Sequence, residues 1–181
     1  SDVCSSDLLG ALRLGGPGEA GFILTDLPPI DMPTAAPDIL FQVQLRGFTP
    51  ILAHPERNRY LSSRPDLLRE MVERGIELQV NSGSLEGIYG RAAMRMAFTL
   101  LDDGLARLVA SDAHAPSGRG PDLSGAARII ASRMGDEAVR TLLEINPSLA
   151  LSGEPLRTLG RAAGRGGKKL FVRDRLRRKS P

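Results

Sequence analysis

Short apolar runs alternate with amphipathic segments of about ten residues along most of the chain. The apolar runs predict buried strands at 21–25, 49–53, 76–80 and 106–110. Helical spacing predicts helices at 38–46, 65–74, 90–103, 123–134 and 137–144, with Asn146-Pro147 closing the last one. Strands separated by helices pair in parallel, so the pattern predicts an α/β fold, either an open doubly wound sheet or a (β/α) barrel.

The chain divides into three segments by composition. Residues 1–20 are left unassigned, because the first nine resemble translated adapter DNA more than a native terminus. Residues 21–156 carry the strand and helix pattern and form the predicted domain. Residues 157–181 hold ten Lys or Arg and one acid, so the net charge of +3 is the sum of −6 in the body and +9 in this tail. Its glycines and charges predict disorder.

Composition excludes several classes of protein. With 41% hydrophobic and 25% charged residues the chain is globular, and no apolar run approaches the roughly 18 residues of a membrane span. The single cysteine, Cys4, excludes an internal disulfide and a Cys-rich zinc site. No signal peptide opens the sequence, which predicts a cytoplasmic location.

Polar side chains follow each of the four predicted strands. They are Asp26 after the first, His54 and Arg57 after the second, Asn81 and Ser82 after the third, and Asp112 and His114 after the fourth. The carboxyl ends of strands are the functional edge of α/β proteins. Both histidines of the chain lie there, so imidazole and carboxylate groups are expected to converge on one rim.

This rim predicts a metal and phosphate site. Imidazole with carboxylate suits Mn, Fe, Zn or Co better than calcium, and an extended Asp112-Ala-His114 would place two ligands on one side. Arg57 and Arg119 are candidate phosphate contacts, because guanidinium binds phosphate bidentately. The sequence has no nucleophile elbow, P-loop or dinucleotide fingerprint, and Gly10 stands where a cysteine phosphatase based on Cys4 would need arginine.

Three sequence blocks at these positions carry a family resemblance. They are Pro50-Ile-Leu-Ala-His-Pro-Glu-Arg-Asn58, Leu78-Gln-Val-Asn-Ser-Gly-Ser-Leu85, and Leu108-Val-Ala-Ser-Asp-Ala-His114 with Arg119. In this order they resemble the bacterial metal-dependent tyrosine phosphatases of the PHP (polymerase and histidinol phosphatase) superfamily, which are encoded with capsule and exopolysaccharide genes. The resemblance covers roughly residues 21–154 and includes the closing segment 146–153.

The resemblance implies a TIM-like barrel with a cluster of metal ions, usually manganese, at the carboxyl-end rim. It implies that Asp26, His54, Asp112 and His114 bind metal and that Arg57 and Arg119 are catalytic and contact phosphate, and it makes Asn81 and Ser82 candidate substrate-binding residues. Asp26 stands where the family has a glutamate that is one methylene longer. The implied reaction is hydrolysis of phosphotyrosine on a membrane-associated tyrosine kinase of polysaccharide export, by a metal-activated water.

The chain departs from the family at its start. The family opens with a His-x-His metal motif, whereas no histidine precedes His54 here, and a complete barrel needs about 250 residues. We therefore expect residues 21–156 to be the C-terminal two-thirds of a barrel, with weak or no activity alone. The alternatives are hydrolysis of a small ester such as histidinol phosphate, and binding of anionic membrane or nucleic acid through the tail. A nucleic-acid partner is not the favoured expectation.

Overall fold

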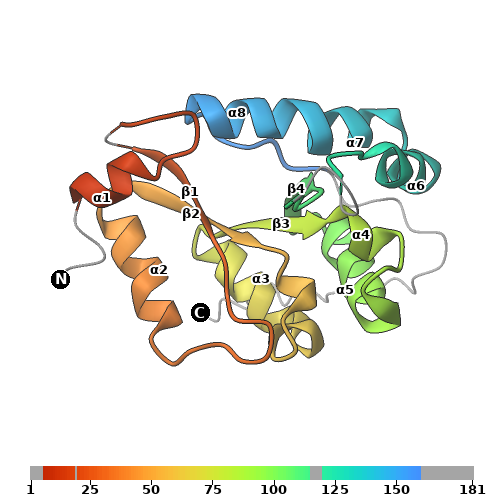
Figure 1. Cartoon of the computed structure of the whole chain (residues 1–181), viewed down its shortest axis with the longest axis horizontal. Helices are drawn as coiled ribbons and strands as arrows, with labels where there is room; N and C mark the ends of the chain where they lie inside the picture. The colour runs from red at the N-terminus through yellow and green to blue at the C-terminus, as the bar shows by residue number, and fades with distance from the viewer. Residues whose placement is uncertain (1–5, 19, 115–119, 160–181) are drawn as a thin grey trace, which may run out of the picture.

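Four parallel strands form one sheet in the computed structural model, which describes residues 6–18, 20–114 and 120–159 (Figure 1). The strands are β1 (Gly21–Thr25), β2 (Phe48–Ala53), β3 (Glu77–Asn81) and β4 (Ala106–Ala110), in the order β1-β2-β3-β4. Ile51 of β2 lies opposite Leu24 of β1 and Glu77 of β3, and a bulge interrupts the β3–β4 register. The predicted α/β class, its four strands and their parallel pairing are confirmed.

The strand order does not reverse, which distinguishes this sheet from a doubly wound one. Because each crossover moves in the same direction and crossovers are right-handed, the connecting helices fall on one face. Helices α2 (Ala36–Leu45), α3 (Pro65–Glu73) and α5 (Gly90–Asp102) lie together below the sheet in Figure 1. Within the described ranges the sheet is open, so closure into a barrel stays a prediction.

Helix ends follow local sequence signals. Pro37 and Pro65 stand in the first turns of α2 and α3. Backbone N–H groups have no partner within the helix there, so a proline costs no helical hydrogen bond. Gly47 and Gly75, each with φ of 85°, follow these two helices in the left-handed conformation that glycine adopts without strain. A glycine therefore follows the C-terminus of both helices.

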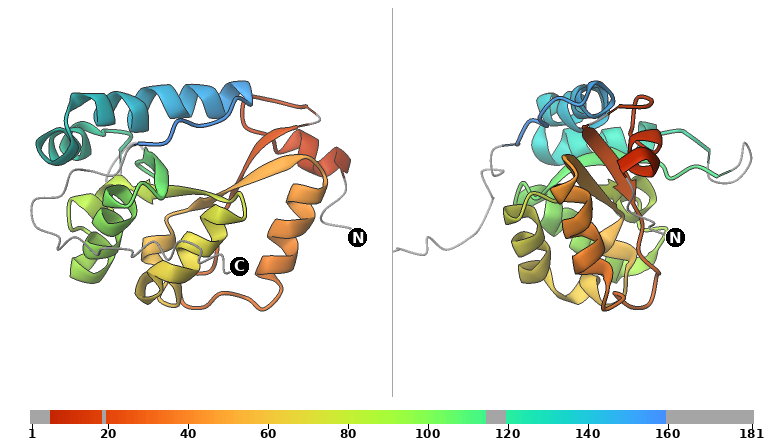
Figure 2. Two further views of the ribbon diagram at one scale, coloured as in Figure 1. Left: turned by 180° about the vertical axis from the view of Figure 1, so that it is seen from behind. Right: turned by 90° about the vertical axis from the view of Figure 1, so that its left-hand side faces the viewer.

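The C-terminal helices form the second helical layer, on the other side of the sheet from α2 and α3 (Figure 2). They are α6 (Ser124–Met134), α7 (Asp136–Arg140), a π-helical turn η3 (Thr141–Ile145) and α8 (Asn146–Ser152). The prediction that Asn146-Pro147 ends the last helix is wrong. The π turn precedes Pro147, which stands in the first turn of α8, so the proline breaks no helical hydrogen bond.

Several short elements have no counterpart among the predicted ones. The helix α1 (Ser6–Ala11) falls in the segment left unassigned. The 3₁₀ turns η1 (Pro55–Arg57) and η2 (Leu61–Ser63) follow β2, and α4 (Ser82–Leu85) follows β3. The turn η1 and the helix α4 begin within two residues of the ends of β2 and β3, so Arg57 and Ser82 stay at the carboxyl edge of the sheet.

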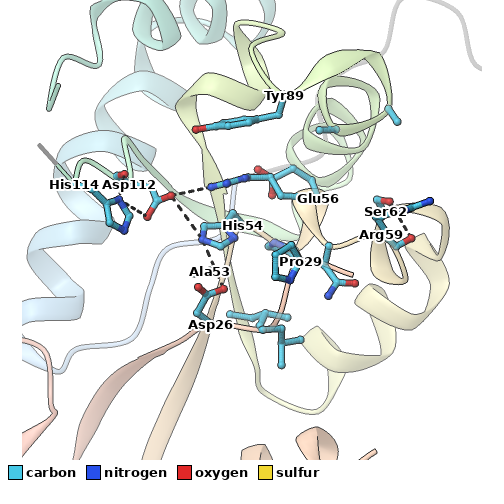
Figure 3. A pocket seen from close by; sticks show the side chains of 17 residues that line it. Asp26, Pro29, Ala53, His54, Glu56, Arg59, Ser62, Tyr89, Asp112 and His114 are labelled. Atoms are coloured by element: carbon cyan, nitrogen blue, oxygen red, sulfur yellow. Dashed lines mark hydrogen bonds and ion pairs between the residues drawn. The ribbon is translucent and has the colours of Figure 1, made fainter. Parts of the chain in front are cut away.

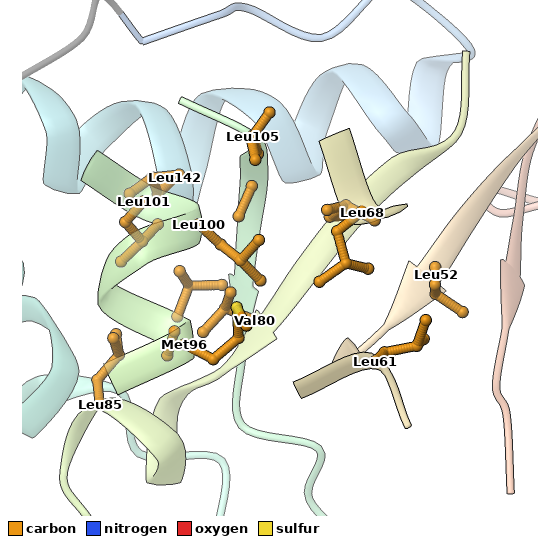
Figure 4. Close-up of a cluster of buried hydrophobic side chains, with 14 of the residues drawn as sticks. Leu52, Leu61, Leu68, Val80, Leu85, Met96, Leu100, Leu101, Leu105 and Leu142 are labelled. Carbon is orange, nitrogen blue, oxygen red and sulfur yellow. The ribbon is translucent and has the colours of Figure 1, made fainter. Parts of the chain in front are cut away.

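The main hydrophobic core lies between the sheet and α3 and α5 and extends to buried residues of α6, α7 and η3. Leu52, Leu78 and Val80 from the strands meet Leu68 and Leu100 from the helices, all without solvent exposure (Figure 4). A smaller cluster on the opposite face joins Phe22, Ile51 and Leu108 to Ala150 and Leu156. This packing fixes the strands and hence the spacing of their carboxyl ends.

None of the described helices is both long and apolar enough to span a membrane. The predicted disorder of the basic tail concerns residues 157–181, of which 160–181 lie outside the described residues.

Candidate functional site

A cavity of about 530 Å³ opens at the carboxyl ends of the strands (Figure 3). Five of the predicted site residues line it, and they come from segments far apart in sequence: Asp26, His54, Arg57, Asp112 and His114. Five further polar or aromatic residues of its lining were not predicted: Glu56, Asn58, Arg59, Ser62 and Tyr89. The expectation that the strand ends converge on one rim is thus met by the geometry.

His54 occupies the point where β2 leaves the sheet. Its backbone is left-handed, with φ of 34°, and its N–H donates to the Gln79 carbonyl at 2.7 Å. Pro55 then starts η1, which turns the chain along the rim. The imidazole is 15% exposed, with Nε2 3.7 Å from Asp26 Oδ1 and 3.8 Å from Asp112 Oδ2. His54 therefore stands between two carboxylates.

Asp112 and His114 meet through a bent backbone. Asp112 has φ of 53°, so the Asp-x-His segment is not extended as the alternation argument assumed. His114 nevertheless turns back, with Nδ1 2.7 Å from the Asp112 carbonyl oxygen and 3.7 Å from Asp112 Oδ1. Because a carbonyl only accepts, this contact needs a proton on Nδ1, and in the corresponding neutral tautomer Nε2 carries the lone pair suited to a metal.

Arg57 is held at the wall of the cavity by two contacts. Its Nη1 donates to Asp112 Oδ2 at 2.8 Å, and its guanidinium lies 4.1 Å from the centroid of the Tyr89 ring. Its side chain keeps 26% of its surface exposed. A planar cation fixed in this way is suited to bind an oxyanion.

Glu56 lies beneath this wall and is 1% exposed. Its Oε1 accepts from the Asn81 N–H at 2.9 Å and from Ser84 Oγ at 2.7 Å. Burial raises the pKa of Glu56 to about 7, against these hydrogen bonds, which lower it. The sequence could have identified Glu56 as a site residue, because it lies between His54 and Arg57. No feature of the local sequence predicted that Glu56 would be buried.

Two predicted substrate-binding residues are buried instead of facing the cavity. Asn81 is not exposed at all and Ser82 is 6% exposed, and neither lines the cavity. The Nδ2 of Asn81 donates to Asp112 Oδ2 at 3.3 Å. Their role in substrate binding stays a prediction. Arg119 lies outside the described residues.

The donor atoms fit a metal in kind but do not form a complete shell. Donors about 2.1 Å from one ion lie at most about 4 Å apart, a limit that the His54–Asp26 and His54–Asp112 separations meet pairwise. Over the part of the chain that the structure describes, no three His, Cys, Asp or Glu side chains form a group that could hold an ion. A metal here would need further ligands.

The parallel sheet and its connecting helices make this an α/β protein. The His, Asp and Arg side chains at the carboxyl ends of the strands form a candidate site for a phosphoester. The family described as "Capsular polysaccharide synthesis, CpsB/CapC" matches residues 12–152, and the chain belongs to this family.

Individual relatives agree with this assignment. Tyrosine-protein phosphatase YwqE of Bacillus subtilis is 35% identical over 135 residues, which cover 75% of this chain and 53% of that protein. Tyrosine-protein phosphatase CpsB of Streptococcus pneumoniae is 30% identical over 113 residues, covering 60% of this chain and 46% of its own length. The chain spans about half the length of these curated relatives.

A solved structure supports the fold. It comes from a crystallographic study of YwqE from Bacillus subtilis and CpsB from Streptococcus pneumoniae, described as unique metal-dependent tyrosine phosphatases. It matches with a TM-score of 0.70 and 33% identity, over 76% of this chain and 56% of that one.

Proposed function

We propose that this chain is part of a metal-dependent protein-tyrosine phosphatase acting in capsular or exopolysaccharide synthesis. One observation carries the proposal: His54, Arg57, Asp112 and His114 line one cavity in a chain of the CpsB/CapC family. Relatives named tyrosine phosphatases and a structural relative described as metal-dependent support the reaction and the metal. Manganese is the proposed ion.

The residues of the site divide into two groups by role. Asp26, His54, Asp112 and His114 would hold the metal, with further ligands from other atoms. When bound, a divalent ion would supply Lewis acidity and would lower the pKa of a water enough for it to act as a nucleophile toward phosphorus. Arg57 binds the phosphate oxygens and stabilises their charge in the transition state, and Arg119 is proposed to do the same.

The cavity wall also suits an aromatic ester. Tyr89, Pro29, Leu27 and Ala93 give it apolar and aromatic surface beside the polar rim. A phosphotyrosine ring can pack on such surface while its phosphate reaches Arg57. The proposed substrate is a phosphotyrosine protein, in particular a membrane-associated kinase of polysaccharide export, and the proposed location is the cytoplasm, where such a kinase uses ATP.

The strand order also favours the family barrel. Four strands in unreversed order, with α2, α3 and α5 on one face, match one arc of a (β/α) barrel. The C-terminal portion of a PHP barrel is therefore the proposed architecture of residues 21–156.

The test compares two isosteric substitutions with and without Mn²⁺. Asp112→Asn removes a rim carboxylate, whereas Asp66→Asn changes a side chain that is 97% exposed on α3. With a phosphotyrosyl peptide we expect weak, Mn²⁺-dependent phosphate release that EDTA abolishes, reduced at least tenfold by Asp112→Asn and unchanged by Asp66→Asn. Hydrolysis that survives EDTA, or equal loss in both variants, would contradict the metal mechanism.

A second substrate separates the family alternatives. Histidinol phosphate assayed under the same conditions should be hydrolysed more slowly than the phosphotyrosyl peptide. A clear preference for the small ester would replace the protein substrate by a small-molecule one.

A further inference from the structure

Glu56 and Asn81 connect the three strand ends that carry the site. Glu56 belongs to η1 after β2, Asn81 ends β3, and Asp112 follows β4. Glu56 borders the cavity and Asn81 does not, but both residues are almost fully buried, at 1% and 0% exposure. Their hydrogen bonds therefore act within the protein.

The first connection joins η1 to the start of α4. Glu56 Oε1 accepts from the Asn81 N–H at 2.9 Å and from Ser84 Oγ at 2.7 Å, while Oε2 has no hydrogen-bond partner in the described structure. A buried carboxylate held by two uncharged donors fixes the spacing of the segments it joins. The turn that carries His54 and Arg57 is thereby attached to β3.

The second connection runs through the side chain of Asn81. Its Oδ1 accepts from the Gly83 N–H at 2.8 Å and caps α4, while its Nδ2 donates to Asp112 Oδ2 at 3.3 Å. The same Asp112 oxygen accepts from Arg57 Nη1 at 2.8 Å. Since Arg57 follows Glu56 in sequence, the contacts close a circuit from Glu56 through Asn81 and Asp112 back to Arg57.

We propose that Glu56 and Asn81 are positioning residues that fix the orientation of Asp112 and Arg57 at the cavity. Asp112 has a left-handed backbone outside any strand or helix, and these contacts restrain the direction of its carboxylate. With Oδ2 turned to Asn81 and Arg57, Oδ1 faces His114. A role of this orientation in catalysis rests on the proposed function, but the chain of hydrogen bonds can be tested without any assay of activity.

The experiment uses Asn81→Asp with Asn146→Asp as its matched control. Aspartate at 81 still caps α4 but loses the donor to Asp112 and adds a second carboxylate beside it. Asn146 is equally buried, and its Nδ2 donates to the Arg107 and Arg157 carbonyls, at 2.7 and 2.9 Å. Substitution there removes buried hydrogen bonds at a distance from the site.

The readout is the Nε–Hε resonance of Arg57 in ¹H–¹⁵N spectra of the metal-free, full 181-residue chain, assigned with Arg57→Lys. We expect Asn81→Asp to shift or broaden this resonance, and Ser84→Ala to shift it less. Asn146→Asp should lower the melting temperature and leave the resonance at its wild-type position. Should Asn81→Asp fail to fold, Asn81→Ser, which keeps a capping oxygen without the charge, takes its place and must shift the resonance.

Two results would overturn the proposal. One is an unchanged Arg57 resonance in a folded Asn81 variant, and the other is an equal change in Asn146→Asp. Because the measurement needs neither metal nor substrate, its outcome is independent of the phosphatase assay that tests the proposed function.

Discussion

Two buried glutamates lie at opposite ends of the sheet and are stabilised differently. Glu77, at the amino end of β3, pairs with Arg107 Nη1 at 2.6 Å. Glu56, at the carboxyl end, accepts hydrogen bonds from a backbone N–H and a hydroxyl, although an arginine is its neighbour in sequence. Burial raises the pKa of both carboxyls.

The difference lies in where the arginine is directed. At the amino end the cation is used inside the fold, where it offsets the charge of Glu77. At the carboxyl end Arg57 turns to Asp112 and the cavity, which leaves its cation positioned for a ligand. Arg107 at the amino end therefore stabilises the fold, whereas Arg57 at the carboxyl end can bind a ligand.

The largest effect is expected where the carboxyl-end cation is removed. Arg57→Ala should lower kcat/KM of the proposed phosphatase by about 10²–10³, the usual loss for one preorganised transition-state contact. Arg57→Lys keeps the positive charge but loses the planar guanidinium, so its kcat/KM should lie between those of wild type and Arg57→Ala. Initial rates with a phosphotyrosyl peptide measure both effects. Equal activity of Arg57→Ala and wild type would show that Arg57 does not contribute to catalysis.

Removing the amino-end cation should affect stability and spare the site. Arg107→Met leaves Glu77 buried without its partner, a change expected to lower the free energy of unfolding by about 3 kcal/mol. Urea denaturation followed by circular dichroism measures this loss. The Arg57 resonance should not move, and a shift would mean that the two ends are coupled.

The pH dependence of stability should reflect the raised pKa of Glu77. The folded chain holds this proton more tightly than the unfolded chain, so the contribution is greatest below the ordinary pKa of 4.5 and is lost as pH rises through the raised value. Glu77→Gln should therefore gain stability relative to wild type as pH rises, by at most about 1.4 kcal/mol per pH unit. Melting curves from pH 4 to 7 test this, and a difference that is constant with pH would contradict it.

The smallest effect is expected from the aromatic neighbour of Arg57. Tyr89→Leu keeps apolar bulk but removes the cation–π contact, which is worth about 0.5–1 kcal/mol at a partly exposed site. A two- to fivefold fall in kcat/KM is the expected result. Tyr60→Leu, which removes the similar contact with Arg64 outside the cavity wall, should leave the rate unchanged.

The sequence predicted the elements whose signals are local. Apolar runs marked the four strands, helical spacing marked the helices between them, and the polar residues after each strand marked the rim. The signals failed where packing decides the outcome. A π turn carries the helix through Asn146-Pro147, and the burial of Glu56 and Asn81 depends on contacts between strand ends far apart in sequence.

In the site, too, local sequence signals did not predict how residues from different segments come into contact. Alternation along an extended Asp-x-His was the only local means of relating Asp112 to His114, and the bent backbone brings the two together by another route. The proximity of His54 to Asp26 follows from strand register, which the pattern of apolar residues does not specify.

The left-handed backbone at His54 and Asp112 has an evolutionary consequence. Among the described residues these are the two non-glycine positions with positive φ, a conformation that costs most side chains about 1 kcal/mol or more. At Asp112 glycine would also remove the acceptor of Arg57 and Asn81, whereas within the described residues His54 has no such bond to its side chain that offsets the backbone cost. Laboratory evolution toward higher melting temperature is thus expected to replace His54 by glycine before Asp112, exchanging function for stability.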